Sequence, residues 1–286
     1  MPSRQRTKRI LLGIAFALSL LVLGYLALRP LAYNYGASAE EAARAMPGDT
    51  GGPTWTRAIT VEAAPEAIWP YLVQFGQGRG GWYSYDWLEN LFGLDIHSVY
   101  EIRPELQNPA IGQEICMGRG FCVSKVSLVE PNQFFGWQAL GEDGSVMWAF
   151  TFGLYPQASG STRLVVRESF GAAGMPAPAL FILEGPDLVM EQKALATLKI
   201  LAEGRKVSPL TTPLEIGCWL AVLAVGAAAG VSIIRRPRWQ PALVVGAAAI
   251  LALLVITFLF PPLWLRWLAA AGLAAGYYMW VARKPA

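Results

Sequence analysis

The residues with the clearest chemical potential lie between Gly76 and Asn90, where glycines run directly into aromatic and acidic side chains. The stretch reads Gly-Gln-Gly-Arg-Gly-Gly-Trp-Tyr-Ser-Tyr-Asp-Trp-Leu-Glu-Asn. Glycine allows sharp backbone turns, and Trp and Tyr combine a large apolar body with a polar end. This composition is typical of a loop that lines a pocket or builds its wall.

Two carboxylates in this stretch, Asp86 and Glu89, are three residues apart and share one face of a short helix expected after Ser84. Paired carboxylates divide acid and base roles when burial separates their pKa values, although Asp86 can instead simply favour the helix dipole. His97 is the single histidine, and a hydrogen-bonded structural role suits it as well as a catalytic one. Asp86, Glu89 and His97 are the catalytic candidates, and the sequence indicates neither a metal nor another cofactor.

The same loop supplies candidate ligand contacts. Arg79 can bind a ligand carboxylate or phosphate, or it can pair with Asp86 or Glu89 and hold the loop. Aromatic residues of the loop can pack in a core or reach a ligand. The ligand-binding candidates are Arg79, Trp82, Tyr83 and Tyr85 in the loop, with Met190, Ala194 and Leu198 on one side of the last predicted helix.

The glycines also match a dinucleotide-binding spacing, Gly76-x-Gly78-x-x-Gly81. That motif needs a strand before it and a helix directly after it to hold a pyrophosphate. Here a predicted helix precedes the glycines and Trp82 follows them, so the spacing indicates a sharp turn and no nucleotide site.

The positioning elements follow from periodicity. Thr56–Glu62 alternates as a strand, and Pro65 suits the first turn of a helix to about Phe75, kinked at Pro70. The period then changes to two, with short turns that make neighbouring strands antiparallel. The expected strands are Gln113–Met117, Phe121–Glu130, Gln133–Leu140, Val146–Tyr155 and Thr162–Phe170, and a last helix is expected over about Pro186–Glu203. This order predicts an α+β domain whose curved sheet wraps on the last helix.

Other polar residues leave alternatives open. Cys116 and Cys122 flank a glycine turn, so they can form a disulfide across a hairpin or stay reduced as small apolar residues. Four charged residues can be buried partners inside the domain or belong to solvated faces: Arg103, Arg167, Glu168 and Glu191.

The composition indicates a membrane protein, because 54% of the 286 residues are hydrophobic and 15% are charged. Four apolar runs approach the roughly 20 residues that a helix needs to cross the hydrocarbon core. The predicted organisation is a cytoplasmic tail (1–9), an anchor (10–28), a linker (29–54), the α+β domain (55–206) and a three-helix region (207–286) with spans at about 216–234, 242–259 and 263–281.

Charge orients these spans. Nine basic residues fall on one side of the membrane: Arg4, Arg6, Lys8, Arg9, Arg235, Arg236, Arg238, Arg283 and Lys284. The positive-inside bias makes that side cytoplasmic and places the domain outside, and Arg266 is expected to reach the interface. The region from Arg29 to Lys206 carries 13 basic and 19 acidic residues, so the net charge of +3 indicates orientation and no nucleic-acid partner. A cleaved signal ending at Ala37-Ser38-Ala39 is the alternative to an anchor.

The chain resembles the START-like, polyketide-cyclase-like superfamily known as SRPBCC, and within it an uncharacterised bacterial membrane-anchored subgroup. The resemblance rests on Ala64–Pro70, Gly76–Asp86 and Asp95–Ser98, and it covers about Asn34 to Arg205. It implies a helix-grip fold with a hydrophobic-ligand cavity under the last helix. It supplies no catalytic residues.

Three functions remain open, of which the first is favoured. In the first, the chain is a multi-pass plasma-membrane protein whose extracytoplasmic START-like domain binds a lipid or hydrophobic small molecule. Alternatively it is a cyclase-type or hydrolase-type enzyme using the same cavity, or a scaffold whose C-terminal spans bind another membrane protein. Converging titratable groups with shifted pKa values favour the enzyme, and an apolar cavity favours the binder.

Overall fold

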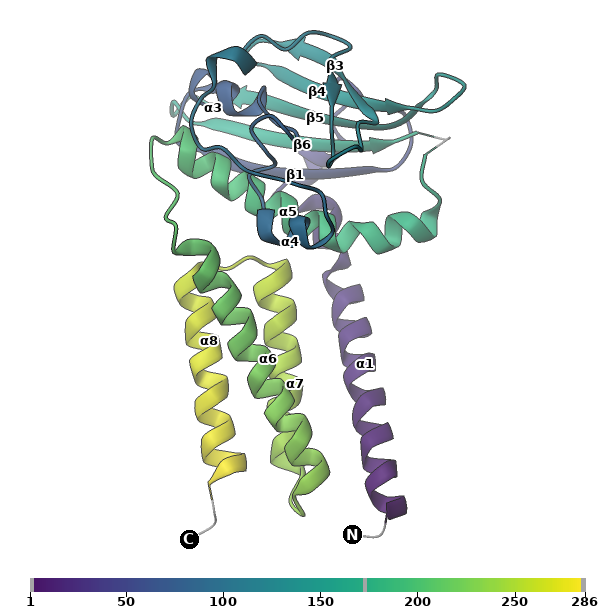
Figure 1. Cartoon of the computed structure of the whole chain (residues 1–286), viewed down its shortest axis with the longest axis vertical. Coiled ribbons are helices and arrows are strands. Elements are labelled where there is room, and N and C mark those ends of the chain that lie inside the picture. Colours follow the sequence, from purple (N-terminus) through teal and green to yellow (C-terminus); the bar gives the residue numbers. More distant parts are fainter. Residues whose placement is uncertain (1–2, 172–173, 284–286) are drawn as a thin grey trace. The chain divides into compact units, whose positions relative to one another are not determined.

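The computed structural model describes residues 3–171 and 174–283. It comprises an all-helical unit, made of the described residues up to Pro30 and from Ser208 onward, and an α+β domain, Leu31–Val207 (Figure 1). The first two residues of the predicted tail, Lys284 and the chain end lie outside the described residues, as do the side chains of Arg4 and Arg6.

One antiparallel sheet of six strands, in the order β1-β6-β5-β4-β3-β2, forms the α+β domain. Short turns join β3 through β6, whereas β1 pairs with β6 along its whole length, from Thr54 opposite Ser169 to Val61 opposite Thr162. The strands are β1 (Thr54–Val61), β2 (Glu114–Ile115), β3 (Ser124–Glu130), β4 (Phe134–Leu140), β5 (Val146–Pro156) and β6 (Thr162–Phe170). The predicted α+β class and the antiparallel sheet are confirmed.

Helices cover one face of this sheet (Figure 1). They are α3 (Pro65–Leu72), α4 (Asp86–Leu91), the 3-10 turn η1 (Pro104–Leu106) and the long α5 (Ala177–Ala202). The short α2 (Ala39–Ala43) instead contacts Arg163 and Arg167, whose side chains alternate with the core residues of β6 and lie on the other face. The closing helix α5 begins at Ala177 and not near Pro186, because Pro176 and Pro178 start it two turns earlier. These extra turns supply part of a groove described below.

The core lies between the sheet and α5, as the period-two pattern predicts. Phe135 and Trp137 of β4 alternate inward, as do Phe150 and Phe152 of β5. They pack against the apolar side of α5, where Leu198 is fully buried. Burial of large rings at this density supplies most of the driving force for folding of the domain.

The segment before β1, predicted as a linker, is held on the sheet by two arginines of β6. Arg167 pairs with Asp49 at 3.1 Å and donates to the carbonyl oxygens of Glu41, Ala42 and Arg44 at 2.9–3.1 Å. Arg163 lies 2.7 Å from the Glu41 carboxylate and lowers its pKa to about 2. The segment is therefore an integral part of the domain.

The glycine loop makes the sharp turn that its spacing predicts. Gly76 and Gly81 pair across it in an antiparallel bridge, and both have positive φ angles. A Cβ on Gly81 would lie 2.6 Å from the Cα of Ser98, whereas a Cβ on Gly78, which also has a positive φ, would meet open space. Only glycine lets the chain pass this close to the Ser98 backbone.

Three described helices are long and apolar enough to cross a membrane: Thr7–Asn34 within α1 (Ser3–Asn34), α6 (Thr211–Arg235) and α7 (Gln240–Phe258). The predicted fourth span over 263–281 is wrong by this measure. Its α-helix, α8 (Leu263–Gly276), ends after 14 residues and continues as a π-helical segment, η2 (Tyr277–Ala282). An apolar run interrupted only by Arg266 therefore did not give one continuous α-helix.

Arg266 is buried inside the helical unit and does not reach outward as predicted. Its guanidinium lies 3.6 Å from the Glu215 carboxylate, donates to the Pro261 carbonyl oxygen at 2.6 Å and stacks on the Phe260 ring. Both charged side chains are almost fully buried. Pairing removes much of the cost that a lone charge has in an apolar setting.

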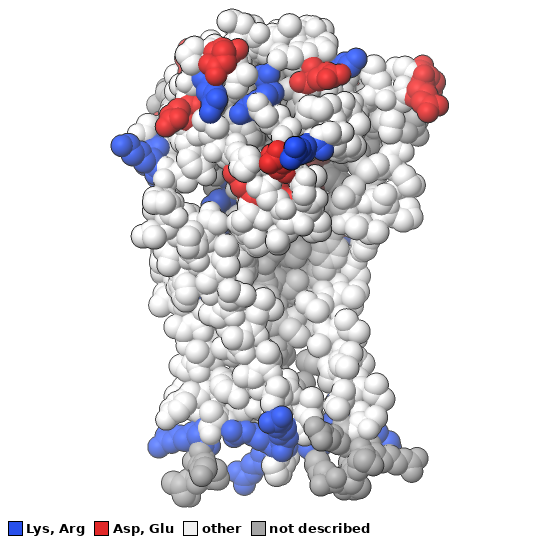
Figure 2. Space-filling view, in the orientation of Figure 1, with Lys and Arg blue, Asp and Glu red and all other residues white. Residues whose placement is uncertain are grey.

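Basic residues gather at one end of the helical unit (Figure 2). Arg9 donates to the Arg236 carbonyl oxygen at 3.4 Å and lies over the Trp239 ring, and Arg236 donates to the Val281 carbonyl oxygen. The ends of α1, α6 and η2 thus meet where the positive-inside argument expects a single charged side.

Substitution of the two loop glycines tests the close approach to Ser98. Gly78→Ala is expected to cost about 1 kcal/mol through its positive φ alone, and Gly81→Ala about 2 kcal/mol more because the added methyl group collides with backbone. Thermal unfolding of the full-length protein in lipid nanodiscs, followed by near-UV circular dichroism, measures both. Equal losses for the two variants would contradict the tight contact.

Candidate functional site

A cavity of about 220 Å³ lies between the concave face of the sheet and α5. Its lining is mainly aromatic and aliphatic, and its polar residues are Ser84, Glu89, Asp187 and Glu191. The apolar lining residues are Phe75, Trp82, Leu94, Met117, Phe121, Trp137, Trp148, Phe150, Phe152, Val166, Met190, Ala194, Leu195 and Leu198. This is the composition of a site for a largely apolar molecule with a polar group.

The hairpin around Gly118 closes one wall. A disulfide joins Cys116 to Cys122, and the residues just inside it, Met117 and Phe121, both face the cavity. The Cys116 carbonyl oxygen accepts a hydrogen bond of 2.9 Å from the backbone N–H of Gln77, so the hairpin is fastened to the glycine loop. Trp82 completes this wall and packs edge-on against Trp137 at 5.8 Å.

Glu89 brings a buried carboxyl group to the same cavity. Glu89 is 1% exposed, and the Ser84 hydroxyl donates a hydrogen bond of 2.5 Å to its Oε1. Burial raises the pKa of Glu89 to about 7, with a small further rise from the negative charge of Asp86, and the Ser84 hydrogen bond opposes this rise. Oε2 has no hydrogen-bond partner among the described residues.

A buried ionic cluster forms the opposite polar wall, where β1, β6 and α5 meet. The Arg57 guanidinium contacts Glu168 at 3.1 Å, Asp187 at 2.6 Å and Glu191. Arg57 also donates to the Ala32 carbonyl oxygen at 3.1 Å, and Trp148 Nε1 donates to Glu168 at 2.7 Å.

One proton is stabilised within this cluster. Burial raises the pKa of Glu168 well above its usual range, and the charge of Asp187 beside it and their shared hydrogen bond add to the rise, while Arg57 opposes it. Burial beside a second carboxyl group therefore favours the protonated form of Glu168.

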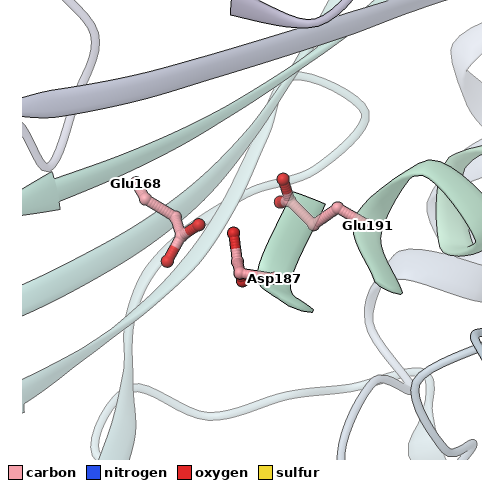
Figure 3. A group of neighbouring side chains, drawn as sticks. All are labelled: Glu168, Asp187 and Glu191. Atoms are coloured by element: carbon pink, nitrogen blue, oxygen red, sulfur yellow. The ribbon is translucent and has the colours of Figure 1, made fainter. Parts of the chain in front are cut away.

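The three carboxylates point toward one another between β6 and α5 (Figure 3). One oxygen from each lies within 4.8 Å of the others, a spacing that a hard cation can bridge. Arg57 Nη1 contacts all three groups, so a guanidinium already supplies positive charge at this position.

A second, larger groove of about 690 Å³ adjoins the cavity. Five residues line both spaces: Met117, Phe121, Trp148, Asp187 and Met190. The groove continues along the first half of α5, with Leu183 and Pro186, and along the ends of β4 and β5. Asp187 and Glu168 stand at the boundary between the two spaces.

The structure brings four of the seven predicted ligand residues to the cavity: Trp82, Met190, Ala194 and Leu198. Tyr83 lies behind the cavity wall, packed on Phe75 and bonded through its hydroxyl to Gln74 Nε2 at 2.6 Å. Tyr85 is buried beneath Lys193, whose ammonium lies 5.3 Å from the ring centre. Both tyrosines are turned away because the positive φ of Tyr83 reverses the direction of the loop.

Arg79 is also remote from the cavity and pairs with neither predicted carboxylate. It donates to the carbonyl oxygens of Val73 at 2.8 Å and Phe75 at 3.1 Å, at the end of α3. These carbonyl groups have no partner within the helix, so Arg79 caps it. Its role in the described structure is to join the loop to α3.

Of the three catalytic candidates, Glu89 alone lines the cavity. Asp86 accepts hydrogen bonds from the backbone N–H and hydroxyl of Ser98 at 2.6 and 2.7 Å, which fixes the loop. His97 has a side chain 77% exposed and lies 3.1 Å from Asp95.

Sequence reasoning missed Arg57 and Asp187, and it left Glu168 and Glu191 undecided. One signal was available. Asp187 and Glu191 are four residues apart on the predicted helix and continue the stripe of Ala194 and Leu198 at helical spacing. A carboxylate within an apolar stripe indicates a buried polar site, but its partner on β1 is 130 residues distant.

The other two charged residues that the sequence left undecided have different roles. Arg167 is buried and holds the segment before β1, whereas Arg103 is half exposed and lies 3.8 Å from Glu105.

Comparison with known proteins gives structural matches over the α+β domain. Neither the protein-family models nor the curated proteins include a match to the sequence. Among solved structures, MLL2253 from Mesorhizobium loti is 15% identical, covers 54% of this chain and 100% of its own, and has a TM-score of 0.34. The Aha1 dimer from Colwellia psychrerythraea is 17% identical over 53% of this chain and 96% of its own, with a TM-score of 0.32. Ara h 8.0201 is 13% identical, covers 54% of this chain and 99% of its own, and has a TM-score of 0.31.

The six-stranded antiparallel sheet and the long closing helix packed on it are the arrangement that the sequence resemblance implied. At these identities and TM-scores the matches carry no conclusion about a ligand or a reaction.

The raised pKa of Glu89 predicts a stability change with pH. Because its folded-state pKa of about 7 exceeds the ordinary 4.5, the folded state holds the proton more tightly. Its contribution to the free energy of unfolding is complete below about pH 4.5 and is lost as the pH rises to about 7, a loss of about 3 kcal/mol. Glu89→Gln should remove this dependence, and Glu142→Gln, on an exposed turn, should retain it.

Melting temperatures between pH 4 and pH 9, together with the infrared band of the protonated carboxyl group, measure this titration. A band in the wild-type protein that disappears near pH 7 and is absent from Glu89→Gln is the expected result. An unchanged pH profile in Glu89→Gln would contradict the assignment.

Proposed function

We propose that this chain is a membrane-anchored module that binds a hydrophobic small molecule or lipid in the cavity between the sheet and α5. The observation that carries the proposal is the cavity itself, about 220 Å³ of mainly aromatic and aliphatic lining in a helix-grip domain. Trp82, Met190, Ala194 and Leu198 are the proposed contacts. A filled core would have left no such space.

The shared lining of the cavity and the groove favours an elongated or flat ligand. One end occupies the inner cavity, and the remainder lies along Leu183 and Pro186 in the groove. Small-molecule sites commonly enclose 300–1,000 Å³. The volume of the inner cavity alone is below this range. The combined volume of the cavity and the groove falls within it.

The membrane placement rests on charge. The basic end of the helical unit is proposed to face the cytoplasm, which places the α+β domain outside and the protein in the plasma membrane. The Cys116–Cys122 disulfide supports this placement, because such bonds persist in oxidising compartments. Ligand exchange with the adjacent bilayer is then the simplest source of a hydrophobic ligand.

An enzyme that uses the same cavity is the second candidate, and Glu89 is the observation that favours it. A general acid or base works best with a pKa near the working pH, and Glu89, at about 7, meets this condition beside an apolar cavity. If an unbiased substrate screen finds turnover that Glu89→Gln abolishes while binding persists, the enzyme replaces the binder.

Filling the cavity tests the binding function. Leu198 is fully buried and lines the cavity, so Leu198→Trp should place a ring in the space that the ligand needs. In a solid core this change would cost roughly 1–3 kcal/mol of strain, whereas a cavity accepts the ring at less cost. We expect a folded variant in nanodiscs that loses a copurifying hydrophobic molecule detected by mass spectrometry. Ile111→Trp, at an exposed position before β2 that lines neither the cavity nor the groove, is the matched control. Normal ligand retention by Leu198→Trp would sink the assignment of this cavity.

Reporter fusions test the orientation. A reporter fused after Arg205 should be active only if it functions outside the cytoplasm, and one fused at Arg238 only if it functions inside. A cytoplasmic signal after Arg205 would reverse the proposed arrangement.

A further inference from the structure

Both spaces of the proposed site carry charge of one sign. Among the described residues that line the cavity or the groove there is no lysine, arginine or histidine. The charged lining residues are Glu89, Glu168, Asp187 and Glu191. A ligand carboxylate or phosphate would meet only negative groups and apolar surface, and desolvating it there would go uncompensated.

Several carboxyl oxygens that line the cavity lack a hydrogen-bond partner among the described residues. Two of them belong to almost fully buried residues: Oε2 of Glu89 and Oε1 of Glu191, on residues 1% and 9% exposed. A buried acceptor without a partner is unfavourable by about 1–3 kcal/mol, so native structures rarely leave one unfilled. A hydrogen-bond donor that enters the cavity can satisfy them.

Arg57 does not neutralise the ionic cluster by itself. One guanidinium faces the carboxyl groups of Glu168, Asp187 and Glu191. A single guanidinium thus serves three carboxyl groups, and burial raises the pKa of one of them, Glu168, well above its usual range. A buried charge without a partner is costly, so the site favours a further cation.

Aromatic faces enclose the same space. Trp82, Trp137 and Trp148 line the cavity together with Phe150, which stacks parallel to Trp137 at 4.7 Å between ring centres. Aromatic rings attract cations through their negative faces, most strongly when water is excluded. The apolar lining and the acidic groups therefore select for the same feature in a ligand.

We propose that the cavity selects an apolar molecule bearing a protonated amine, whose N–H groups bond to Glu191 and Glu89 while its hydrocarbon part packs on the tryptophans. This inference rests on the proposed binding function and adds the chemical class of the ligand. Fatty acids and other anionic lipids are excluded as ligands, although they are equally hydrophobic.

Three matched probes separate the two proposals: 2-(1-naphthyl)ethylamine, 2-(1-naphthyl)ethanol and 1-naphthylacetate. Equilibrium dialysis at pH 7 against the full chain in nanodiscs, with empty nanodiscs to subtract partitioning, measures their dissociation constants. The amine is expected to bind at least about tenfold more tightly than the alcohol, and the carboxylate more weakly than the alcohol. Equal binding of all three, or tightest binding of the carboxylate, would overturn the amine inference and leave the binding function standing. No saturable binding by any of them would overturn both.

Variants locate the amine contact. Glu191→Gln should bring the amine to within about threefold of the alcohol and leave the affinity for the alcohol unchanged. Glu142→Gln should retain the full preference. A folded Glu191→Gln that retains the full preference would refute the contact. If this variant does not fold, as its melting curve would show, the comparison of the three probes in the wild-type protein still decides the inference.

Discussion

The guanidinium of Arg57 joins the elements on which the domain and its cavity depend. It lies on β1 and contacts Glu168 on β6 and both Asp187 and Glu191 on α5. Arg57 is 1% exposed, so its guanidinium is shielded from solvent. Its Nε also donates to Ala32, whose carbonyl group lies in the last turn of α1 and has no partner within the helix. Removing one partner from such a buried cluster commonly costs 3–5 kcal/mol, so Arg57 constrains where α5 lies on the sheet.

The position of α5 in turn decides that there is a cavity. Its apolar stripe, with Leu195 and Leu198, packs in the core and lines the cavity, while Glu191 and Asp187, one and two turns earlier, contact Arg57. Between these two attachments the rings of β4 and β5 do not fill the space. The same ionic contacts thus hold the cavity open and give it negative charge.

The aromatic loop has a different role from the one that its composition indicates. Arg79, Asp86 and Tyr83 form hydrogen bonds to nearby backbone or side-chain groups, which hold the loop in place. Trp82, Ser84 and Glu89 are the members that reach the cavity. A dense group of chemically capable residues can therefore serve largely to position three of its members.

Periodicity, turn residues and local composition determined the strands, the antiparallel sheet, the closing helix and three apolar helices, because each depends on contacts or spacing within one segment. The same local signals fail at the ends of elements, as at the start of α5 and the end of α8. Tertiary structure decided which loop residues reach the cavity, since the positive φ at Tyr83 reverses the chain there. It also decided the partners of Arg57 and Arg266. Glu191 is 134 residues from Arg57, and no spacing rule connects charges that meet only when a sheet closes on a helix.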